Sequence, residues 1–161
     1  MFKIFKKNKS CDIYSPIIRG YSIGLENVPD KVFATKMMGE GIGLINDDNR
    51  IIAPFDGEII MVFPSKHAVG IRSNEGVEVL IHIGLDTVNF AGEGFISYVS
   101  EGDKIKQGDI LISFDVDFMT KHKVDLTTPM VITNSNKFNI EVFANNGEIT
   151  NSSIVLRCIE K

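Results

Sequence analysis

Short apolar runs, interrupted by residues that favour turns, recur along the chain from Ser15 onward. The runs are rich in Ile and Val, while Gly, Pro, Asn and Asp stand in interruptions that come about every 8 to 12 residues. Such spacing is typical of an antiparallel β-sandwich or barrel. We therefore predict an all-β, antiparallel, sandwich-like or barrel-like fold with strands at 17–25, 41–45, 50–53, 57–63, 94–99, 109–114, 130–133 and 154–159.

Little of the pattern is helical. One short helix is predicted at 118–124, behind an N-cap at Asp117, and a single helical turn is predicted after Asp30. His122 would lie on the solvated face of the longer helix, so we interpret it as a structural residue.

Residues 15–20 and 53–57 resemble each other, because each segment places a Pro a few residues before a Gly that opens a strand. A repeated spacing of this kind indicates an internal duplication. We include it in the predicted fold.

A hairpin is predicted within residues 67–88. In the run 76–88, period-two alternation separates two faces of a strand. The face expected to meet the core carries Val77, Val79, Ile81 and Ile83, and the opposite face carries Glu78, Leu80 and His82. A second strand at 67–72 is joined to this run by the turn-forming residues 73–76.

The length of the connecting turn decides which residues of the two strands face each other. A loop of two or four residues would pair positions whose numbers sum to 149, which puts His67 opposite His82 with Cβ atoms about 4.5 to 5.5 Å apart. A loop of three or five residues would break this pairing. In the predicted register the histidine face also carries Phe63, Ser65, Val69 and Ile71.

Two adjacent imidazoles favour phosphoryl chemistry. Neutral imidazole is a good nucleophile near pH 7, and each ring disfavours protonation of the other. One ring nitrogen would hold the phosphoryl group covalently while the other ring donates a hydrogen bond to its oxygens. The hydroxyl of Ser65, on the same predicted face, would bond the His67 ring and fix its tautomer.

Three other interpretations of the histidine pair stay open at this level. The two rings could be satisfied members of a half-buried sheet. They could bind zinc with Asp86 or Glu78 in a zinc-dependent hydrolase, although the chain has no His-Glu-x-x-His motif and no dedicated metal site is predicted. The domain could also be a non-catalytic regulatory docking module.

The size and composition suit one cytoplasmic domain. The 161 residues are 43% hydrophobic with a net charge of -4, which fits a single core and disfavours nucleic acid as a partner. The sequence has no apolar run of roughly 18 residues and no signal peptide. We therefore predict a flexible basic tail at 1–14, one domain at 15–161 and a cytoplasmic location. Cys11 and Cys158 are predicted to be reduced thiols.

Several motifs occur in a fixed order along the chain. They include Ala-Pro-Phe-Asp-Gly-Glu-Ile at 53–59 and Gly-Val-Glu-Val-Leu-Ile-His-Ile-Gly-Leu-Asp-Thr-Val at 76–88, and others lie at 28–34, 38–42, 67–68, 92–95 and 128–134. In these motifs, from about Ser15 to the end, the chain resembles the glucose-type IIA component of the bacterial sugar phosphotransferase system.

The resemblance implies a β-sandwich phosphocarrier in which His82 accepts the phosphoryl group on Nε2, His67 assists transfer and Ser65 orients His67. It implies a relay from the histidine phosphocarrier protein to the IIB domain of a membrane sugar permease, with further docking on regulatory target proteins. The carrier would meet the membrane only peripherally, through the permease. No cofactor is implied, and zinc would bind the two histidines only at an interface with a partner protein.

The partner surface is predicted around the two histidines. By the resemblance, Asp30 and Phe33 join the histidine face, where strand alternation already places Phe63 and Val69. Asp86 follows shortly after the phosphoacceptor in the chain. An apolar centre with an acidic rim calls for a basic partner.

Overall fold

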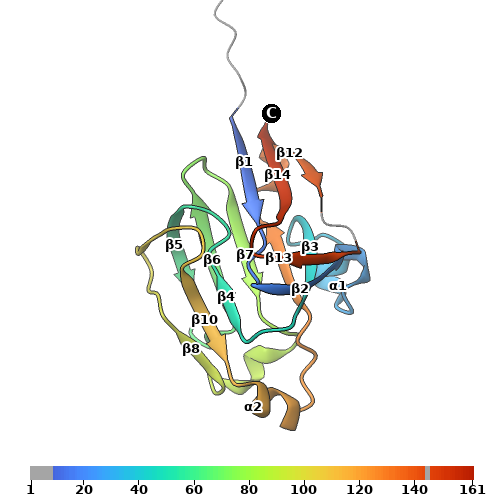
Figure 1. Ribbon diagram of the computed structural model, residues 1–161, viewed down its shortest axis with the longest axis vertical. Coiled ribbons are helices and arrows are strands. Elements are labelled where there is room, and N and C mark those ends of the chain that lie inside the picture. The colour runs from blue at the N-terminus through green and yellow to red at the C-terminus, as the bar shows by residue number, and fades with distance from the viewer. Residues whose placement is uncertain (1–8, 144–145) are drawn as a thin grey trace, which may run out of the picture.

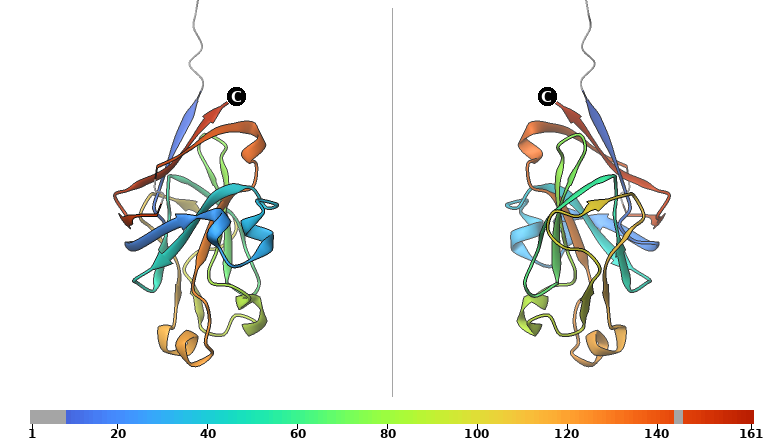
Figure 2. Two further views of the ribbon diagram at one scale, coloured as in Figure 1. Left: turned by 90° about the vertical axis from the view of Figure 1, so that its right-hand side faces the viewer. Right: turned by 90° about the vertical axis from the view of Figure 1, so that its left-hand side faces the viewer.

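The strands of the protein pair antiparallel and stack into the layers of a β-sandwich (Figures 1 and 2). The computed structural model describes residues 9–143 and 146–161. The largest sheet has the strand order β13 (Glu148–Thr150), β2 (Arg19–Gly24), β3 (Glu40–Asn46), β11 (Thr128–Ile132), β7 (Glu78–His82), β6 (Ala68–Ser73), β5 (Gly57–Val62) and β9 (Lys104–Ile105). The predicted all-β, antiparallel sandwich is confirmed.

Two smaller sheets complete the sandwich. One has the order β4 (Arg50–Ile52), β10 (Ile110–Phe114) and β8 (Phe95–Ser97), and the other has the order β1 (Ser10–Tyr14), β14 (Ile154–Glu160) and β12 (Phe138–Val142). The helical elements are α1 (Lys31–Ala34), α2 (Val116–Lys121) and the single turns η1 (Leu25–Asn27), η2 (Thr87–Phe90) and η3 (Ser135–Lys137). Within residues 9–143 and 146–161, no helix has both the length and the apolarity that a bilayer crossing requires.

The short helices begin at aspartate caps. The carboxylate of Asp30 accepts a hydrogen bond from the Val32 N–H at 2.9 Å, so the predicted turn after Asp30 is confirmed. The prediction for α2 was wrong by two residues, because Asp115 and not Asp117 is the cap: its carboxylate accepts from the Phe118 N–H at 3.0 Å.

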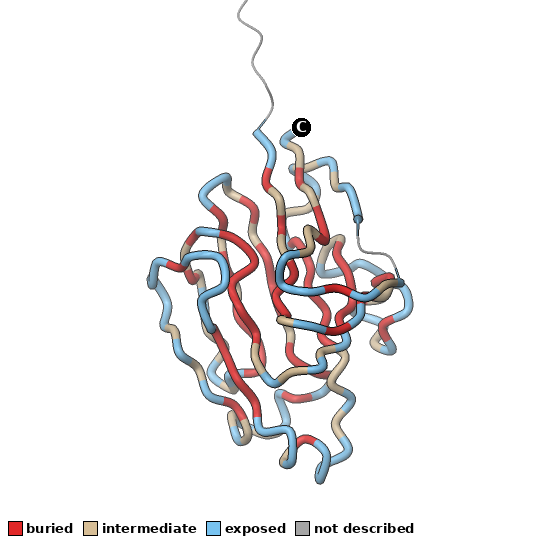
Figure 3. Tube along the Cα trace, viewed as in Figure 1, coloured by how far each residue is buried: buried red, intermediate tan, exposed pale blue. Residues whose placement is uncertain are grey.

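Two apolar clusters lie on opposite faces of the largest sheet. The main core fills the space between the sheets, and Figure 3 shows its buried residues running along the strands. The second cluster lies on the outer face, under η1 and α1, and consists of Leu25, Val28, Phe33, Ala68, Leu80 and Val131. Because successive strand residues point to opposite faces, β6 and β7 contribute alternately to both clusters.

The N-terminal strand β1 was not predicted. Cys11 and Ile13 are buried in the main core, and Asp12 forms an ion pair with Arg157 of β14 at 2.6 Å. The prediction of a flexible tail at 1–14 is therefore wrong for Ser10–Tyr14, whereas residues 1–8 lie outside the described residues. The strands β9, β12 and β13 were also missed, since they are short or carry mostly exposed side chains.

The two cysteines face each other across β1 and β14 as free thiols. Burial raises the pKa of both Cys11 and Cys158 to about 12, so neither is a thiolate near neutral pH.

The two segments that resemble each other in sequence lie side by side and antiparallel. The Ile52 N–H donates to the carbonyl of Pro16 at 2.8 Å, and the Tyr14 N–H donates to the carbonyl of Pro54 at 3.0 Å. This reciprocal arrangement is what two related copies of one strand-opening segment would form. The internal duplication itself stays a prediction.

The β6–β7 hairpin has a three-residue loop, so the predicted register was wrong by one residue. Ser73 pairs with Val77 on both sides of the loop: its N–H donates to the Val77 carbonyl at 2.9 Å and its hydroxyl accepts from the Val77 N–H at 3.0 Å. Ala68 therefore faces His82, and Arg72 faces Glu78. A three-residue loop is one of the two lengths that were expected to break the pairing of His67 with His82.

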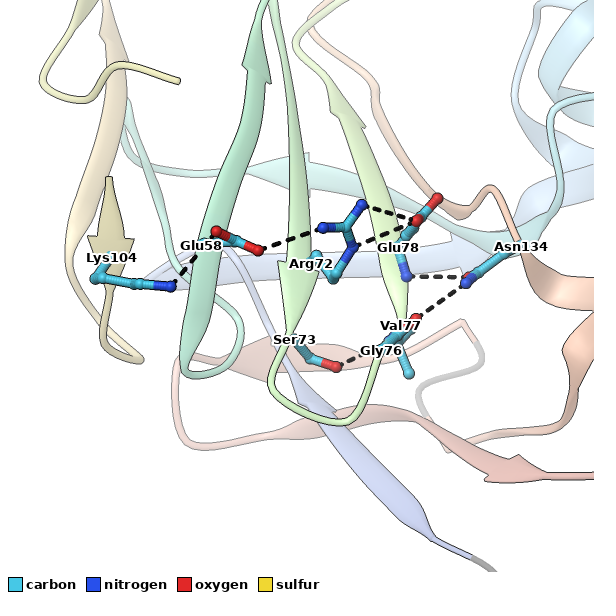
Figure 4. Close-up of polar contacts among 8 residues, drawn as sticks. All are labelled: Glu58, Arg72, Ser73, Gly76, Val77, Glu78, Lys104 and Asn134. Atoms are coloured by element: carbon cyan, nitrogen blue, oxygen red, sulfur yellow. Dashed lines mark hydrogen bonds and ion pairs between the residues drawn. The ribbon is translucent and has the colours of Figure 1, made fainter. Parts of the chain in front are cut away.

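Polar contacts fix the loop end of the hairpin (Figure 4). The side-chain amide of Asn134 accepts from the Glu78 N–H and donates to the Gly76 carbonyl, both at 3.0 Å. On the outer face Arg72 pairs with Glu78 at 3.2 Å and with Glu58 at 3.3 Å, between partly exposed side chains. Exposed ion pairs contribute little to stability, whereas a backbone group left without its partner is expensive.

We expect Asn134→Ala to lower the free energy of unfolding by roughly 1–3 kcal/mol, because it leaves the Glu78 N–H and the Gly76 carbonyl unpaired. Arg72→Met, which removes two exposed ion pairs and keeps most of the side-chain bulk, should lower it by less than about 1 kcal/mol. Urea unfolding followed by circular dichroism measures both. A larger loss in Arg72→Met than in Asn134→Ala would contradict this ranking.

Candidate functional site

His82 is the last residue of β7 and points to the outer face of the sheet, beside the second apolar cluster. Its Nδ1–H donates to the carbonyl of Gly84 at 2.8 Å. Gly84 adopts a left-handed backbone with φ 72°, which turns its carbonyl back toward the ring. With Nδ1 as the donor, the neutral ring carries its lone pair on Nε2.

His67 lies beside His82 as predicted, but the two residues are not direct cross-strand partners. It precedes β6, and its carbonyl accepts from the Ile83 N–H at 2.7 Å, so in the register it faces Ile83. Lys66 has φ 56°, which bends the chain just before His67, so the alternation that starts with β6 does not fix the direction of this side chain. The rings of His67 and His82 lie 4.8 Å apart between centroids, at 78°. The predicted meeting of the two histidines is confirmed although the predicted register was wrong.

Two phenylalanines flank the histidine pair. The Phe33 ring of α1 lies 5.1 Å from that of His82, and the Phe63 ring lies 5.6 Å from that of His67. His67 is only 4% exposed and Phe33 6%, whereas His82 is partly exposed. The predicted proximity of Phe33 and Phe63 to the pair is confirmed, and the aromatic rings withdraw both imidazoles from water.

Burial keeps both imidazoles neutral. It lowers the pKa of His67 from 6.5 to about 4, and a charge on His82 would lower it further. Burial also lowers the pKa of His82, while the Gly84 carbonyl and the charges of Asp30 and Asp86 partly oppose this shift. At neutral pH the pair therefore offers a nucleophilic nitrogen and a neutral neighbouring ring.

Ser65 does not play its predicted part. In the described part of the chain no hydrogen bond joins its hydroxyl to His67, and the buried Nδ1 of His67 has no hydrogen-bond partner. The prediction relied on strand alternation from Ser65 to His67, and the left-handed backbone of Lys66 breaks that alternation. Buried polar atoms without partners are uncommon, and a catalytic role is one of the reasons for which they occur.

Val69 and Ile71 do not belong to the histidine face, so their prediction was wrong. The one-residue change of register turns both into the main core, where they are 0% exposed. Ala68 takes their place on the histidine side, where it packs in one cluster with Phe33 and with Leu80, which was predicted on that face. The sequence did carry a signal for this exchange, because a register that pairs Arg72 with Glu78 brings opposite charges together and leaves Val69 and Ile71 on the buried face.

The rim of the site combines acidic and apolar side chains. Asp30 and Asp86 lie close enough to act on the charge of His82, as the prediction of an acidic rim requires. Val32, beside Phe33 in α1, is 46% exposed, and Val88, two residues after Asp86, is 52% exposed. The sequence-based predictions missed both valines, although each lies within two residues of one that they included.

A cavity of about 510 Å³ is lined in part by the turn that follows His82. Its lining includes Leu85, Asp86 and Phe90, together with His122 at the end of α2. The His122 ring packs on Phe118 with centroids 4.2 Å apart, and its Nδ1–H donates to the Phe118 carbonyl at 2.8 Å. Within residues 9–143 and 146–161, no three His, Cys, Asp or Glu side chains are placed to share a metal ion.

Comparison with known proteins finds a matching family and several relatives of this chain. Residues 11–138 match the family described as phosphoenolpyruvate-dependent sugar phosphotransferase system, EIIA 1. The chain is 49% identical over 122 residues to the PTS system glucose-specific EIIA component of Halalkalibacterium halodurans, a match that covers 76% of this chain and 70% of that protein. It is 50% identical over 123 residues to the PTS system glucose-specific EIICBA component of Staphylococcus saprophyticus, covering 76% of this chain and 18% of that protein.

Other relatives and a solved structure agree with these matches. The PTS system glucosamine-specific EIICBA component of Bacillus subtilis is 45% identical over 120 residues, covering 74% of this chain and 19% of that protein. The chain thus spans about a fifth of the length of the EIICBA relatives that it matches. The structure of glucose permease IIA from Mycoplasma capricolum superposes with a TM-score of 0.85 at 35% identity, over 93% of this chain and 96% of that one.

The lowered pKa of His67 predicts a pH-dependent stability. Because the unfolded chain takes up a proton near pH 6.5 and the folded chain only near pH 4, this histidine stabilises the fold above pH 6.5, and its contribution is lost as the pH falls toward 4. The loss should be roughly 1–3 kcal/mol. His67→Gln should remove this part of the slope, measured by urea unfolding at several pH values.

The control is Ser65→Ala, which removes no titratable group and no hydrogen bond to His67. It should keep the wild-type slope between pH 6.5 and 4. If His67→Gln retained that slope as well, the folded pKa of His67 would not be lowered.

Proposed function

Because this chain belongs to the EIIA 1 family of the phosphoenolpyruvate-dependent sugar phosphotransferase system, we propose that it is a phosphohistidine carrier in sugar uptake, with His82 as the phosphoacceptor. The observation that carries the proposal is the partly exposed His82 ring, whose lowered pKa keeps it neutral and whose Nδ1–H bond to Gly84 leaves the lone pair on Nε2. The family supports phosphoryl transfer over a zinc-dependent hydrolase or a purely regulatory docking module. No resident cofactor is proposed, since the imidazole itself is the nucleophile.

The proposed reaction is an in-line transfer to Nε2. The bond between phosphorus and Nε2 forms as the phosphorus–nitrogen bond of the donor phosphohistidine breaks. The proton on Nδ1 stays in place, so the phosphorylated ring carries a positive charge. The Gly84 carbonyl and the carboxylates of Asp30 and Asp86 stabilise that charge.

His67 is proposed to assist the transfer. Its neutral ring lies edge-on to that of His82, where an N–H would donate to an oxygen of the phosphoryl group. Burial keeps the ring neutral, so it supports the phosphoryl group by hydrogen bonding and not by a permanent charge. In this proposal Ser65 takes no part in orienting His67.

The proposed partners are the histidine phosphocarrier protein as donor and the IIB domain of a sugar permease as acceptor, with regulatory target proteins docking on the same surface. Relatives whose EIIA portion belongs to EIICBA components support the IIB assignment. These relatives are named for glucose and for glucosamine, so the proposal names no sugar. The carrier would act in the cytoplasm and meet the membrane through the permease. Zinc would bind the histidine pair only where a partner protein lends a carboxylate.

Incubation with phosphoenolpyruvate, the first phosphotransferase enzyme and the histidine phosphocarrier protein should add one acid-labile, base-stable phosphate to the chain, detected by intact-mass spectrometry. His82→Ala should abolish the mass gain without unfolding the protein, because His82 is partly exposed and outside the main core. His67→Gln should accept phosphate but release it to a IIB domain at least about tenfold more slowly. The amide of Gln can donate a hydrogen bond to the phosphoryl oxygens, but it cannot take up and release a proton as an imidazole does. Undiminished uptake in His82→Ala would refute the assignment of the acceptor.

Rim charges and rim valines should act on different steps of docking. Asp86→Asn keeps a residue that tolerates the left-handed backbone of this position, φ 58°, but removes its charge. It should slow association with the basic donor by about twofold to fivefold, and the defect should shrink at high ionic strength. Val32→Ser should mainly speed dissociation, with the wild-type salt dependence.

Stopped-flow transfer rates measured against salt concentration separate the two effects. The matched control is Glu148→Gln, which removes one acidic charge in β13, a strand at the edge of the largest sheet. It should transfer at the wild-type rate. A salt-independent defect in Asp86→Asn would place Asp86 inside the reaction site and not at its rim.

A further inference from the structure

A buried hydroxyl holds the turn that follows His82. Thr87 is the first residue of η2, is 0% exposed, and its Oγ1–H donates to the carbonyl of Ile83 at 2.6 Å. The residue before it, Asp86, has a left-handed backbone, so the chain doubles back and brings position 87 over position 83. The turn is therefore closed by a side chain and not by backbone bonds alone.

Ile83 links this hydroxyl to both histidines. Its N–H donates to the carbonyl of His67 at 2.7 Å, while its carbonyl accepts from Thr87. The next residue, Gly84, supplies the carbonyl that holds His82. The backbone of Ile83 and Gly84 thus touches the main chain of one histidine and the ring of the other.

The methyl group of Thr87 fixes Gly84 by contact. A Cβ placed on Gly84 would lie 2.8 Å from Cγ2 of Thr87 and 3.1 Å from the carbonyl oxygen of Asp125, so the glycine is enclosed on both sides. Beyond it, the Leu85 N–H donates to the same Asp125 carbonyl at 2.9 Å. Since Gly84 has no side chain to limit its rotation, these neighbours define the direction of its carbonyl.

We infer that Thr87 is a positioning residue for His82. Its hydroxyl anchors the Ile83 carbonyl and its methyl packs against Gly84, which together aim the Gly84 carbonyl at Nδ1. A ring that donates from Nδ1 keeps its lone pair on Nε2, so Thr87 selects the nitrogen that reacts. The effect on transfer rests on the proposed phosphocarrier function, whereas the effect on the tautomer does not.

The test uses the full chain, labelled with ¹⁵N-histidine, in the wild type and in Thr87→Val, Thr87→Ser and Ser15→Ala. NMR of the ring nitrogens reports the tautomer of each histidine. His122, whose Nδ1–H donates to the Phe118 carbonyl, serves as an internal control in every sample. Ser15→Ala removes a buried hydroxyl that bonds to the Ile17 carbonyl at 2.9 Å, in the connection between β1 and β2.

We expect the wild type to hold His82 in the Nδ1–H tautomer. Thr87→Val should populate the other tautomer of His82 without changing that of His122, and should slow phosphoryl transfer to His82 by about fivefold to tenfold, the effect of roughly one hydrogen bond. Thr87→Ser, which keeps the hydroxyl, and Ser15→Ala should both retain the wild-type tautomer. In Thr87→Val, ³¹P NMR should detect some phosphate on Nδ1.

Three results would overturn the inference. They are a wild-type His82 protonated on Nε2, a Thr87→Val variant with the wild-type tautomer and transfer rate, and a Ser15→Ala variant that shifts the tautomer equally. The wild-type measurement can still overturn the inference if Thr87→Val does not fold, because a His82 protonated on Nε2 contradicts it. A wild type that shows the expected tautomer but takes up no phosphate would refute the proposed function and leave the positioning role of Thr87 intact.

Discussion

The hydrogen bond from His82 Nδ1 to the Gly84 carbonyl is the contact on which the site depends. It fixes the ring, determines which nitrogen is free, and provides an acceptor for the proton that remains when the ring becomes charged. The bond exists because the strand ends at His82 and a left-handed glycine follows two residues later. The fold therefore supplies, through one backbone carbonyl, what many enzymes obtain from a separate carboxylate.

A second constraint is that the histidine pair must be shielded from water so that both rings stay neutral, while His82 must stay accessible to a partner protein. The outer face of the largest sheet meets both needs, because η1 and α1 cover part of it and leave His82 partly exposed. Burial lowers the pKa of both rings, and the nearby acidic side chains Asp30 and Asp86 limit the shift at His82. The same surface, with exposed Val32 and Val88 around it, suits a partner that excludes water on docking.

Some errors in the sequence-based predictions share one origin. The direction of His67 and the proposed role of Ser65 both assumed that period-two alternation continues without interruption. Alternation fails where the backbone leaves the extended region, and here it does so at Lys66, a residue whose type does not favour a left-handed backbone. The hairpin register was wrong for a separate reason, because the four turn-forming residues form a three-residue loop once Ser73 pairs with Val77.

The sequence by itself determined the antiparallel β architecture, the strand that carries His82, the Asp30 cap and the motifs of the family, since each of these depends on local periodicity or on short residue patterns. Tertiary structure decided the rest. It turned Val69 and Ile71 into the core, put Ala68 in their place beside Leu80, and brought Phe33 of α1 against His82 from far away in the chain. Contacts of this kind depend on register and on the packing of distant segments, which are set by the energy of the whole fold and not by any one short residue pattern.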